Sequence, residues 1–232
     1  MEIQEDFHAG EKMTQSLQVM FEDRDLLVVY KPPDTLVVSS PWTPASETIV
    51  GLARAYAGER VWPVHRLDRD TSGPVLLAKT QEATRSFHHQ FESHTIGKIY
   101  ECIVEGKLLP QHGMIDMPIS KGKRWSEAQV GRGGKAARTE FWVKEHCGPV
   151  TWVKVKPMTG RFHQIRAHLA AKGHPLAHDP IYYKNSPWGF LRRVPLHCAS
   201  ISFDHPRTGH RMTIESPWPP DLQEALARFR RS

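Results

Sequence analysis

Short apolar runs, each long enough for a single β-strand, recur along nearly the whole chain and constrain its fold more than any other feature. Most of them alternate in polarity or end at turn-forming residues, which is typical of strands. A hairpin is expected across the turn at residues 146–149, because it separates two such runs. We expect strands at residues 18–21, 26–30, 75–78, 98–105, 139–144, 150–156, 196–203 and 211–215.

Fewer segments repeat apolar side chains at the spacing of a helix. We expect helices at residues 47–59, 81–92 and 161–172, and a short one after Pro219 and Pro220. Thr80 should cap the second helix, and the third should place Phe162, Ile165 and Leu169 on its apolar side. Because strands outnumber helices, we predict an α+β fold with a mainly antiparallel mixed sheet and flanking helices.

Length and composition indicate one globular catalytic domain, which we place at residues 17–232. The chain has 232 residues, of which 39% are hydrophobic and 24% are charged. Residues 1–16 are polar and aperiodic, so we expect a flexible extension there. No apolar run approaches the roughly 20 residues of a membrane helix, and the acidic N-terminus is unlike a secretory signal. We therefore expect a cytoplasmic monomer that neither associates with a membrane nor needs an obligatory protein partner.

Charge and cysteine content narrow the possible partners. Cys102, Cys147 and Cys198 form no CxxC pair, so neither a disulfide framework nor a zinc ribbon is indicated. The formal charge of +6 and the pI near 9.3 favour a polyanion as partner. The basic run KGKRW at residues 121–125 combines phosphate-binding charge with a ring that can stack on a base; a solvated surface loop is the alternative.

The segment HRLDRDTSG at residues 65–73 is the most informative for chemistry. It places the carboxylate of Asp68 between Arg66 and Arg69, on a turn that Gly73 closes. Cations this close keep a carboxylate ionised and lower its pKa by about 1–3 units. Such a group can act as a nucleophile or a base at neutral pH. For an isolated Arg-x-Asp pattern, a capping turn with ion pairs is the alternative interpretation.

Several blocks of the chain, in order, carry a family resemblance. HRLDRDTSG, followed by an apolar strand and Lys79, resembles the HRLDxxTSGxxLLAK motif of the A-type family of ribosomal large-subunit pseudouridine synthases. EDRDLLVVYKP resembles the opening strand pair of that family, and KIYECIVEG resembles its KxYxAxVxG strand. GKAARTEF, TGRFHQIRAHLAAKGHPLAHDPIY and LHCASISFDHP resemble later blocks. The likeness extends over nearly the whole chain, so chance similarity is a poor explanation.

The resemblance implies an enzyme that isomerises specific uridines in structured ribosomal or transfer RNA, without a cofactor or a metal. It implies that Asp68 is the nucleophile, attacking C6 of the base or C1′ of the sugar. Tyr100 would stack on the base and help to remove the C5 proton, and Arg166 would pair with Asp68. Arg66 would enter the RNA stack where the flipped uridine had been. Further RNA contacts are expected from Arg69, His163, Gln164, Lys121, Lys123 and Arg124.

Two of these assignments have structural alternatives. Tyr100 lies in an alternating strand, where a tyrosine is usually a core residue. Arg166 lies off the apolar stripe of its helix, so a solvent-covered face is the alternative. His65 we interpret as a hydrogen-bonding residue behind the site.

The chain departs from the family pattern at three places. Phe162 replaces a threonine and His178 a glycine before Asp179, which should alter the pocket wall and a loop. Pro33, Asp34 and Thr35 replace an alanine-glycine turn, and we expect this to affect only a connection. There is no room for the S4-type RNA-binding module that many relatives carry, so recognition should come from the catalytic domain itself.

Other functions remain open at this level. His163, His168, His174 and His178 invite a zinc site, but Pro175 disrupts the helical spacing of the last two. A non-catalytic RNA-binding module on the same fold would be favoured if Asp68 or Tyr100 were replaced. A hydrolase triad of His65, Asp68 and Ser72 is disfavoured, since no GxSxG motif occurs and the three residues share one short turn.

Overall fold

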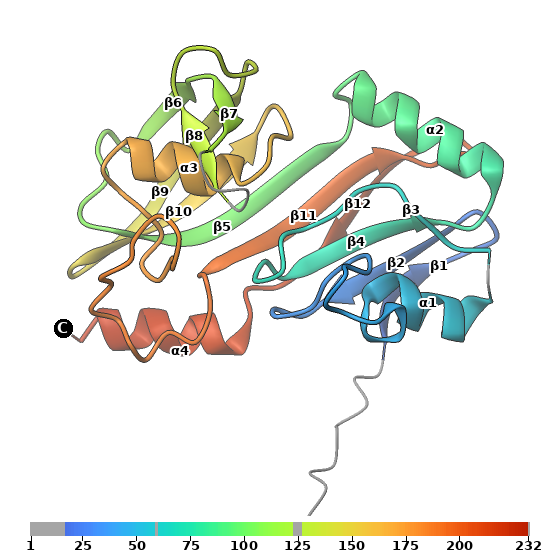
Figure 1. Cartoon of the computed structure of the whole chain (residues 1–232), viewed down its shortest axis with the longest axis horizontal. Helices are drawn as coiled ribbons and strands as arrows, with labels where there is room; N and C mark the ends of the chain where they lie inside the picture. Colours follow the sequence, from blue (N-terminus) through green and yellow to red (C-terminus); the bar gives the residue numbers. More distant parts are fainter. Residues whose placement is uncertain (1–16, 59, 123–126, 232) are drawn as a thin grey trace, which may run out of the picture.

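The computed structural model describes residues 17–58, 60–122 and 127–231, and the extension predicted at residues 1–16 lies outside them. In this part of the chain the strands form three antiparallel sheets (Figure 1). The four-stranded sheet has the order β1 (Gln18–Glu22), β2 (Leu26–Lys31), β4 (Gly73–Ala78), β3 (Trp62–Pro63). The six-stranded sheet has the order β12 (Arg211–Glu215), β11 (Leu196–Asp204), β5 (Gly97–Glu105), β10 (Val150–Pro157), β9 (Arg138–Cys147), β6 (His112–Asp116). A small pair joins β7 (Ile119–Lys121) to β8 (Ala128–Val130).

The two central strands of the smaller sheet, β2 and β4, are buried on both faces. Leu27 belongs to the same cluster as the buried face of helix α1 (Ile49–Ala57). Its neighbour Leu26 belongs instead to the cluster of helix α2 (Gln81–Glu92). Successive side chains of a strand point to opposite faces, so both must be apolar here. This explains why the sequence shows continuous apolar runs at these strands. Helix α2 has the predicted bounds and the predicted Thr80 cap.

The two larger sheets meet where β4 begins. Ser72 forms a parallel bridge with His197 of β11, which brings the 65–73 loop against the second strand of the six-stranded sheet. Gly73 has a positive φ of 128°, and a Cβ on it would lie 2.4 Å from the carbonyl oxygen of Cys198. Only glycine allows the two backbones to approach this closely. The loop that carries Asp68 is thereby joined to the strand next to β5.

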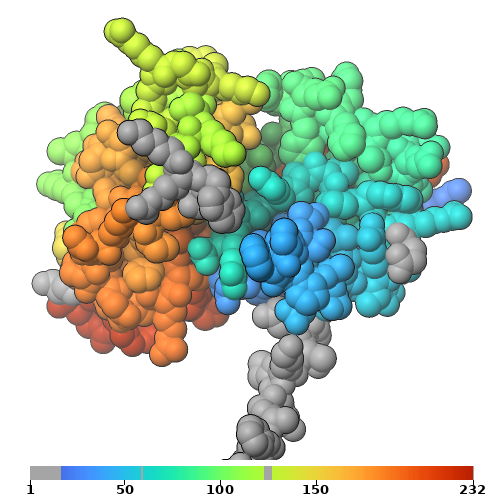
Figure 2. All heavy atoms as spheres, viewed as in Figure 1, coloured from blue at the N-terminus to red at the C-terminus, as the bar shows by residue number. Residues whose placement is uncertain are grey.

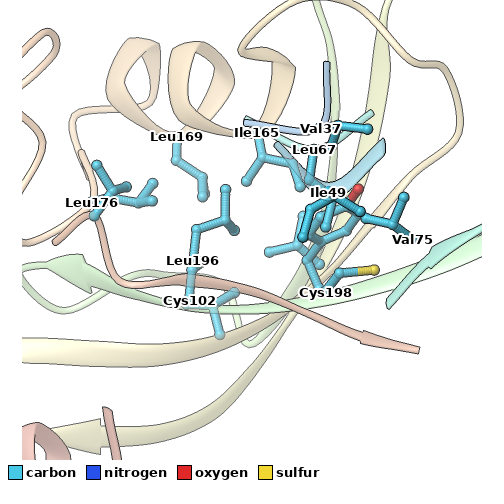
Figure 3. Close-up of a cluster of buried hydrophobic side chains, with 14 of the residues drawn as sticks. Val37, Ile49, Leu67, Val75, Cys102, Ile165, Leu169, Leu176, Leu196 and Cys198 are labelled. Carbon is cyan, nitrogen blue, oxygen red and sulfur yellow. The ribbon is translucent and has the colours of Figure 1, made fainter. Parts of the chain in front are cut away.

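Helix α3 (Gln164–Ala171) covers the six-stranded sheet beside this junction. Figure 3 shows Ile165 and Leu169 pointing from the helix toward Leu196 and Cys102. These four side chains belong to one buried cluster that also includes residues of the smaller sheet. The core is therefore continuous across the junction and holds the two sheets together.

The opposite face of the six-stranded sheet carries helix α4 (Pro220–Phe229). Leu226 and Phe229 pack in a separate cluster with Ile103 of β5. In β5, Ile103 and Cys102 thus face different clusters, as the predicted alternation requires. Among the described residues, no helix is both long enough and apolar enough to span a bilayer.

The predicted α+β class and its antiparallel pairing are confirmed, although the strands are divided among three sheets. The third helix begins later than predicted, at Gln164, because His163 adopts a left-handed conformation with φ 51° and ψ 24°. Phe162 therefore lies outside the helix, where its side chain is exposed instead of packing in the core. Four short strands, β3, β6, β7 and β8, were not predicted, since their apolar patterns are too brief to stand out.

Candidate active site

A pocket of about 180 Å³ opens between the 65–73 loop, strand β5 and the segment that leads into α3. In the space-filling view a hollow at the top separates the yellow-green and orange part of the molecule from the part that is blue, cyan and green (Figure 2). The pocket is lined by both charged and apolar side chains, among them Arg66, Asp68, Lys98, Tyr100, Phe162, His163 and Arg166. Residues far apart in the sequence are thus combined in one concave site, which is the usual form of a ligand site.

Asp68 is the acidic group of this pocket. Its side chain is 29% exposed, and its Oδ2 lies 3.8 Å from Nη1 of Arg166. Burial raises the pKa of Asp68 above its ordinary value, and the charges of Arg166 and Arg66 act against that rise. The predicted lowering of this pKa is therefore wrong, because desolvation outweighs the nearby cations. A carboxylate that is poorly solvated is a stronger nucleophile than one surrounded by water.

Arg69, the second arginine of the motif, pairs with Asp34 and does not line the pocket that contains Asp68. Its Nε donates to Oδ1 of Asp34 at 2.6 Å, and both side chains are exposed. Asp34 adopts a left-handed conformation with φ 58° in the turn after β2. The turn that was predicted to affect only a connection is thus joined to the motif by an exposed ion pair.

Arg166 is buried, so the alternative of a solvated helix face is wrong. Its Nε and Nη2 donate to the two carboxylate oxygens of Asp179 at 2.7 and 2.8 Å. Its Nη1 donates to Nε2 of His163 at 2.9 Å. The predicted pair with Asp68 is present only as the longer 3.8 Å contact. Asp179 is the principal partner and was missed, although it belongs to the HDPIY block that was compared with the family.

Tyr100 is 8% exposed and belongs to the large core cluster while also lining the pocket. Burial raises the pKa of its phenol well above the ordinary value, and Cys198 and Asp68 add to the rise. The hydroxyl therefore stays protonated at neutral pH. Tyr100 is thus both a core residue and a pocket-lining residue, because its strand forms the wall between the core and the pocket.

Comparisons with known proteins show which family the chain belongs to. A family model described as RNA pseudouridylate synthase matches residues 25–171. The chain is 36% identical over 225 residues to the uncharacterized RNA pseudouridine synthase YlyB of Bacillus subtilis (strain 168), an alignment that covers 93% of this chain and 74% of that protein. The chain belongs to the RNA pseudouridylate synthase family. The predicted enzyme class, an RNA pseudouridine synthase and thus an isomerase, is thereby confirmed.

Further similarities support this placement of the synthase. It is 35% identical over 223 residues to the ribosomal large subunit pseudouridine synthase C of Escherichia coli (strain K12), covering 91% of this chain and 70% of that protein. Its fold matches that of human RNA Pseudouridylate Synthase Domain Containing 1, with a TM-score of 0.74, 24% identity and coverage of 93% and 95% of the two chains. Human RNA Pseudouridylate Synthase Domain Containing 4 gives the same TM-score at 21% identity, with coverage of 92% and 93%.

Two predicted RNA-contacting residues of the synthase have mainly internal partners. Gln164 is buried; its Oε1 accepts from Thr159 and from the backbone N–H of Arg161, and its Nε2 donates to residues of β9. The amide is fully engaged, so Gln164 shapes the loop before α3 instead of offering a free group to RNA. The imidazole of His163 is held neutral, since burial and Arg166 lower its pKa to about 3.

Arg66 and the basic run present charge to the solvent. Arg66 is exposed at the pocket, and its guanidinium has no hydrogen-bond or ion-pair partner within the part of the chain that the structure describes. Lys121 is the exposed last residue of β7. The predicted contacts Lys123 and Arg124 lie outside the described residues.

The hydrolase triad does not form. Nε2 of His65 accepts a hydrogen bond from the backbone N–H of Leu76 at 2.9 Å, and burial lowers the pKa of His65 to about 3. Ser72 is fully buried and bonds to Nδ1 of His197 at 2.9 Å. Burial lowers the pKa of His197, so its imidazole is neutral. Its one N–H, on Nε2, donates to the carbonyl oxygen of Ser216, so Nδ1 accepts and Ser72 is the donor. His65 supports β4 from behind the site, as the sequence predicted.

Two buried cations beneath the 65–73 loop were missed by sequence reasoning. Nζ of Lys31 donates to the carbonyl oxygens of Pro32, Thr35 and Arg69 at 2.9, 2.7 and 2.7 Å. Burial lowers the pKa of Lys31 to about 7. At the other end of the loop, Arg193 donates to Oγ of Ser72 at 3.1 Å. The signal for Lys31 was its place at the end of an otherwise apolar strand.

Three of the four histidines considered as zinc ligands, His163, His168 and His174, are engaged in other bonds. Nδ1 of His178 is buried without a hydrogen-bond partner among the described residues. His168 contacts the hydroxyl of Thr139, and His174 contacts the carbonyl oxygen of Glu105. A different group in the described residues has metal-like spacing, with ligand atoms within 4.8 Å of one another: Asp23, Asp25 and His205. Both carboxylate oxygens of Asp25 accept from Arg207, and Asp23 accepts from His205 at 2.6 Å. This group is therefore an ion-pair network that ties the β1–β2 turn to the β11–β12 turn.

Proposed function

We propose that the synthase isomerises specific uridines in large-subunit ribosomal RNA, with Asp68 as the nucleophile. The observation that carries the proposal is the partly exposed carboxylate of Asp68 in a pocket with Tyr100 and Arg166. The ribosomal substrate is suggested by the name of the Escherichia coli relative. Transfer RNA is the second candidate that the sequence resemblance leaves open.

The reaction needs no net oxidation and no outside group. The bond between C1′ and N1 of the uridine breaks, a bond between C1′ and C5 forms, and the C5 proton leaves while N1 gains one. Asp68 attacks C6 or C1′ and is released when the product forms, so the carboxylate is regenerated. Product and substrate have the same atoms, and the balance therefore calls for no cofactor.

Arg166 and Tyr100 have distinct roles in this proposal. Arg166 is immobilised by Asp179, and its Nη1 faces Asp68, so it steadies the carboxylate and favours its ionised form. The ring of Tyr100 offers a flat surface for uracil. Because its phenol stays protonated, the hydroxyl can relay a proton during removal of the C5 proton but cannot begin as a phenolate.

The target uridine must leave its stack before Asp68 can reach it, since the pocket is too small to admit a helix. Arg66 is exposed, unpaired within the described residues and on the rim of the same pocket. A planar guanidinium both stacks and donates hydrogen bonds, so Arg66 suits the space left by the flipped base. The surplus of positive charge would hold the RNA backbone around it.

The test begins with the RNA of cells that have or lack this chain. Pseudouridines are mapped in ribosomal and transfer RNA from both, and a uridine that is modified only when the protein is present identifies the substrate. Purified protein is then incubated with a transcript of that region labelled with tritium at uridine C5, and tritium release is measured. A modified position in transfer RNA alone would overturn the ribosomal proposal. No release from any RNA would overturn the proposed function as a whole. We also propose that residues 17–232 act as one domain and that the protein is a cytoplasmic monomer.

A further inference from the structure

Phe162 is an aromatic ring held at the mouth of the pocket, where it has 42% of its surface exposed. It precedes α3 and stands where the family pattern has threonine. Its ring stacks on the imidazole of His163, with the centroids 3.8 Å apart and the planes 19° from parallel. Since the imidazole covers one face of the ring, the exposed surface lies on the other face and the rim.

The underlying imidazole is itself fixed in place. His163 has the left-handed backbone conformation, which is unfavourable for a residue with a side chain and persists only when its surroundings enforce it. Nε2 of His163 accepts from Arg166, and its Nδ1 lies 3.3 Å from the hydroxyl of Tyr182. Arg166 is in turn locked by Asp179. Phe162 is therefore backed by a rigid ring, which lowers the entropy that stacking a ligand on it would cost.

The position of Phe162 favours a base other than the target uridine as its ligand. Nε2 of His163 lies 3.8 Å from Oδ2 of Asp68, and Phe162 lies against a face of that imidazole. A base on the free face of Phe162 would have the phenyl ring between it and the imidazole that lies next to Asp68. A neighbouring nucleotide of the same RNA strand fits this position, because every base offers a π face. The pocket rim also carries Arg66, which can contact a phosphate or a base.

We propose that Phe162 is a stacking platform for a nucleobase that flanks the target uridine, a subsite that the threonine of the family pattern would not provide. This inference rests on the proposed function, since it requires that RNA enters the pocket. It makes Phe162 a substrate-binding residue that contributes affinity and register but takes no part in the bond-making steps.

The experiment uses synthetic stem-loops around the uridine that mapping identifies. One has all its bases, and two others lack the base of a single nucleotide, on the 5′ or the 3′ side of the target. Dissociation constants and single-turnover rates are measured for the wild type, Phe162→Ala, Phe162→Leu and Phe162→Trp. Stacking predicts that Phe162→Ala weakens binding of the complete stem-loop by roughly 5- to 150-fold, with the single-turnover rate at saturating enzyme little changed. Phe162→Trp should bind at least as tightly as the wild type, and Phe162→Leu should fall between the wild type and Phe162→Ala.

The abasic RNAs decide whether the ring acts through a base. Removing the base that stacks on Phe162 should weaken the wild type but have little further effect on Phe162→Ala. Trp42→Ala is the matched control, because Trp42 is 88% exposed and does not line the pocket; it should bind as the wild type does. Equal affinities of the wild type and Phe162→Ala would overturn the platform. So would a Phe162→Ala loss that stays undiminished on both abasic RNAs. If the wild type itself modifies no RNA, the proposed function has failed instead.

Discussion

Arg166 donates two parallel hydrogen bonds to Asp179, at 2.7 and 2.8 Å, and both residues are almost completely buried. Asp179 also accepts from the backbone N–H groups of Ile181 and Tyr182, so its carboxylate is fully satisfied. This pair, and not the contact with Asp68, determines where the guanidinium lies. The third nitrogen of Arg166 is left to face His163 and Asp68.

Asp179→Asn should destabilise the protein strongly, because it leaves the buried charge of Arg166 without a full counter-charge. Breaking a buried ion pair by removing one partner typically lowers the free energy of unfolding by about 3–5 kcal/mol. Asp34→Asn is the matched control, since the Asp34–Arg69 pair is exposed and should contribute about 1 kcal/mol or less. Urea unfolding of both variants measures the difference. Similar small losses in the two variants would show that Arg166 is held by other contacts.

Asp68→Asn should keep the fold and RNA affinity but lower turnover by roughly 10³-fold or more, because an amide cannot act as the charged nucleophile. In the wild type, burial raises the pKa of Asp68, so kcat/KM should fall on acidification at a pH above the usual range for an aspartate. Tritium release from RNA labelled at uridine C5 measures both effects. Substantial release by the variant would refute the assignment.

Lys31 should make the activity sensitive to mild alkali. Its ammonium supplies three N–H donors to three carbonyl oxygens, including that of Arg69 in the loop next to Asp68. Burial lowers its pKa to about 7, so above that pH the amine has one donor too few and the loop is held less firmly. We expect kcat/KM to decline as the pH rises through this value, and Lys31→Met, although slower overall, to lack that decline.

The pH dependence of stability distinguishes this loss of activity from unfolding, because activity and stability should change in opposite directions. The unfolded Lys31 keeps its proton up to about pH 10.4. Between about pH 7 and that value the unfolded state binds more protons than the folded state, so this group increases the free energy of unfolding as the pH rises. Urea unfolding at pH 6 and pH 9 checks this. If kcat/KM of Lys31→Met declined with pH in the same way as that of the wild type, a group other than Lys31 would be responsible.

Arg66→Ala should slow the reaction on a folded stem-loop much more than on a short unstructured oligonucleotide with the same target sequence. Extruding a stacked base costs a few kcal/mol, and the guanidinium in the vacancy offsets part of that cost. A flexible single strand has little stacking to lose. Comparing kcat/KM for both RNAs, in the wild type and the variant, isolates this contribution, since damage to Asp68 would affect both equally. Equal losses would mean that Arg66 only supports the loop.

Elements with a strong local pattern could be predicted from the amino-acid sequence alone. The continuous apolar runs of β2 and β4, helix α2 with its Thr80 cap, and the alternation in β5 follow from the period of apolar side chains. The motif around Asp68 likewise located the loop that carries the site. Each of these depends on neighbours within a few residues, which a sequence displays directly.

The pairing of the charged side chains, in contrast, depends on the packing of distant elements. Arg69 turns to Asp34, 35 residues away along the chain, and Arg166 to Asp179 instead of to Asp68. Adjacent charges in a motif suggested other partners, but a side chain pairs with whatever the packed elements bring within reach. The same holds for Phe162, which the left-handed conformation of His163 removes from the helix and leaves at the pocket mouth. Helical spacing predicts a core position only while the helix continues, and where it begins is settled by contacts that the local sequence does not contain.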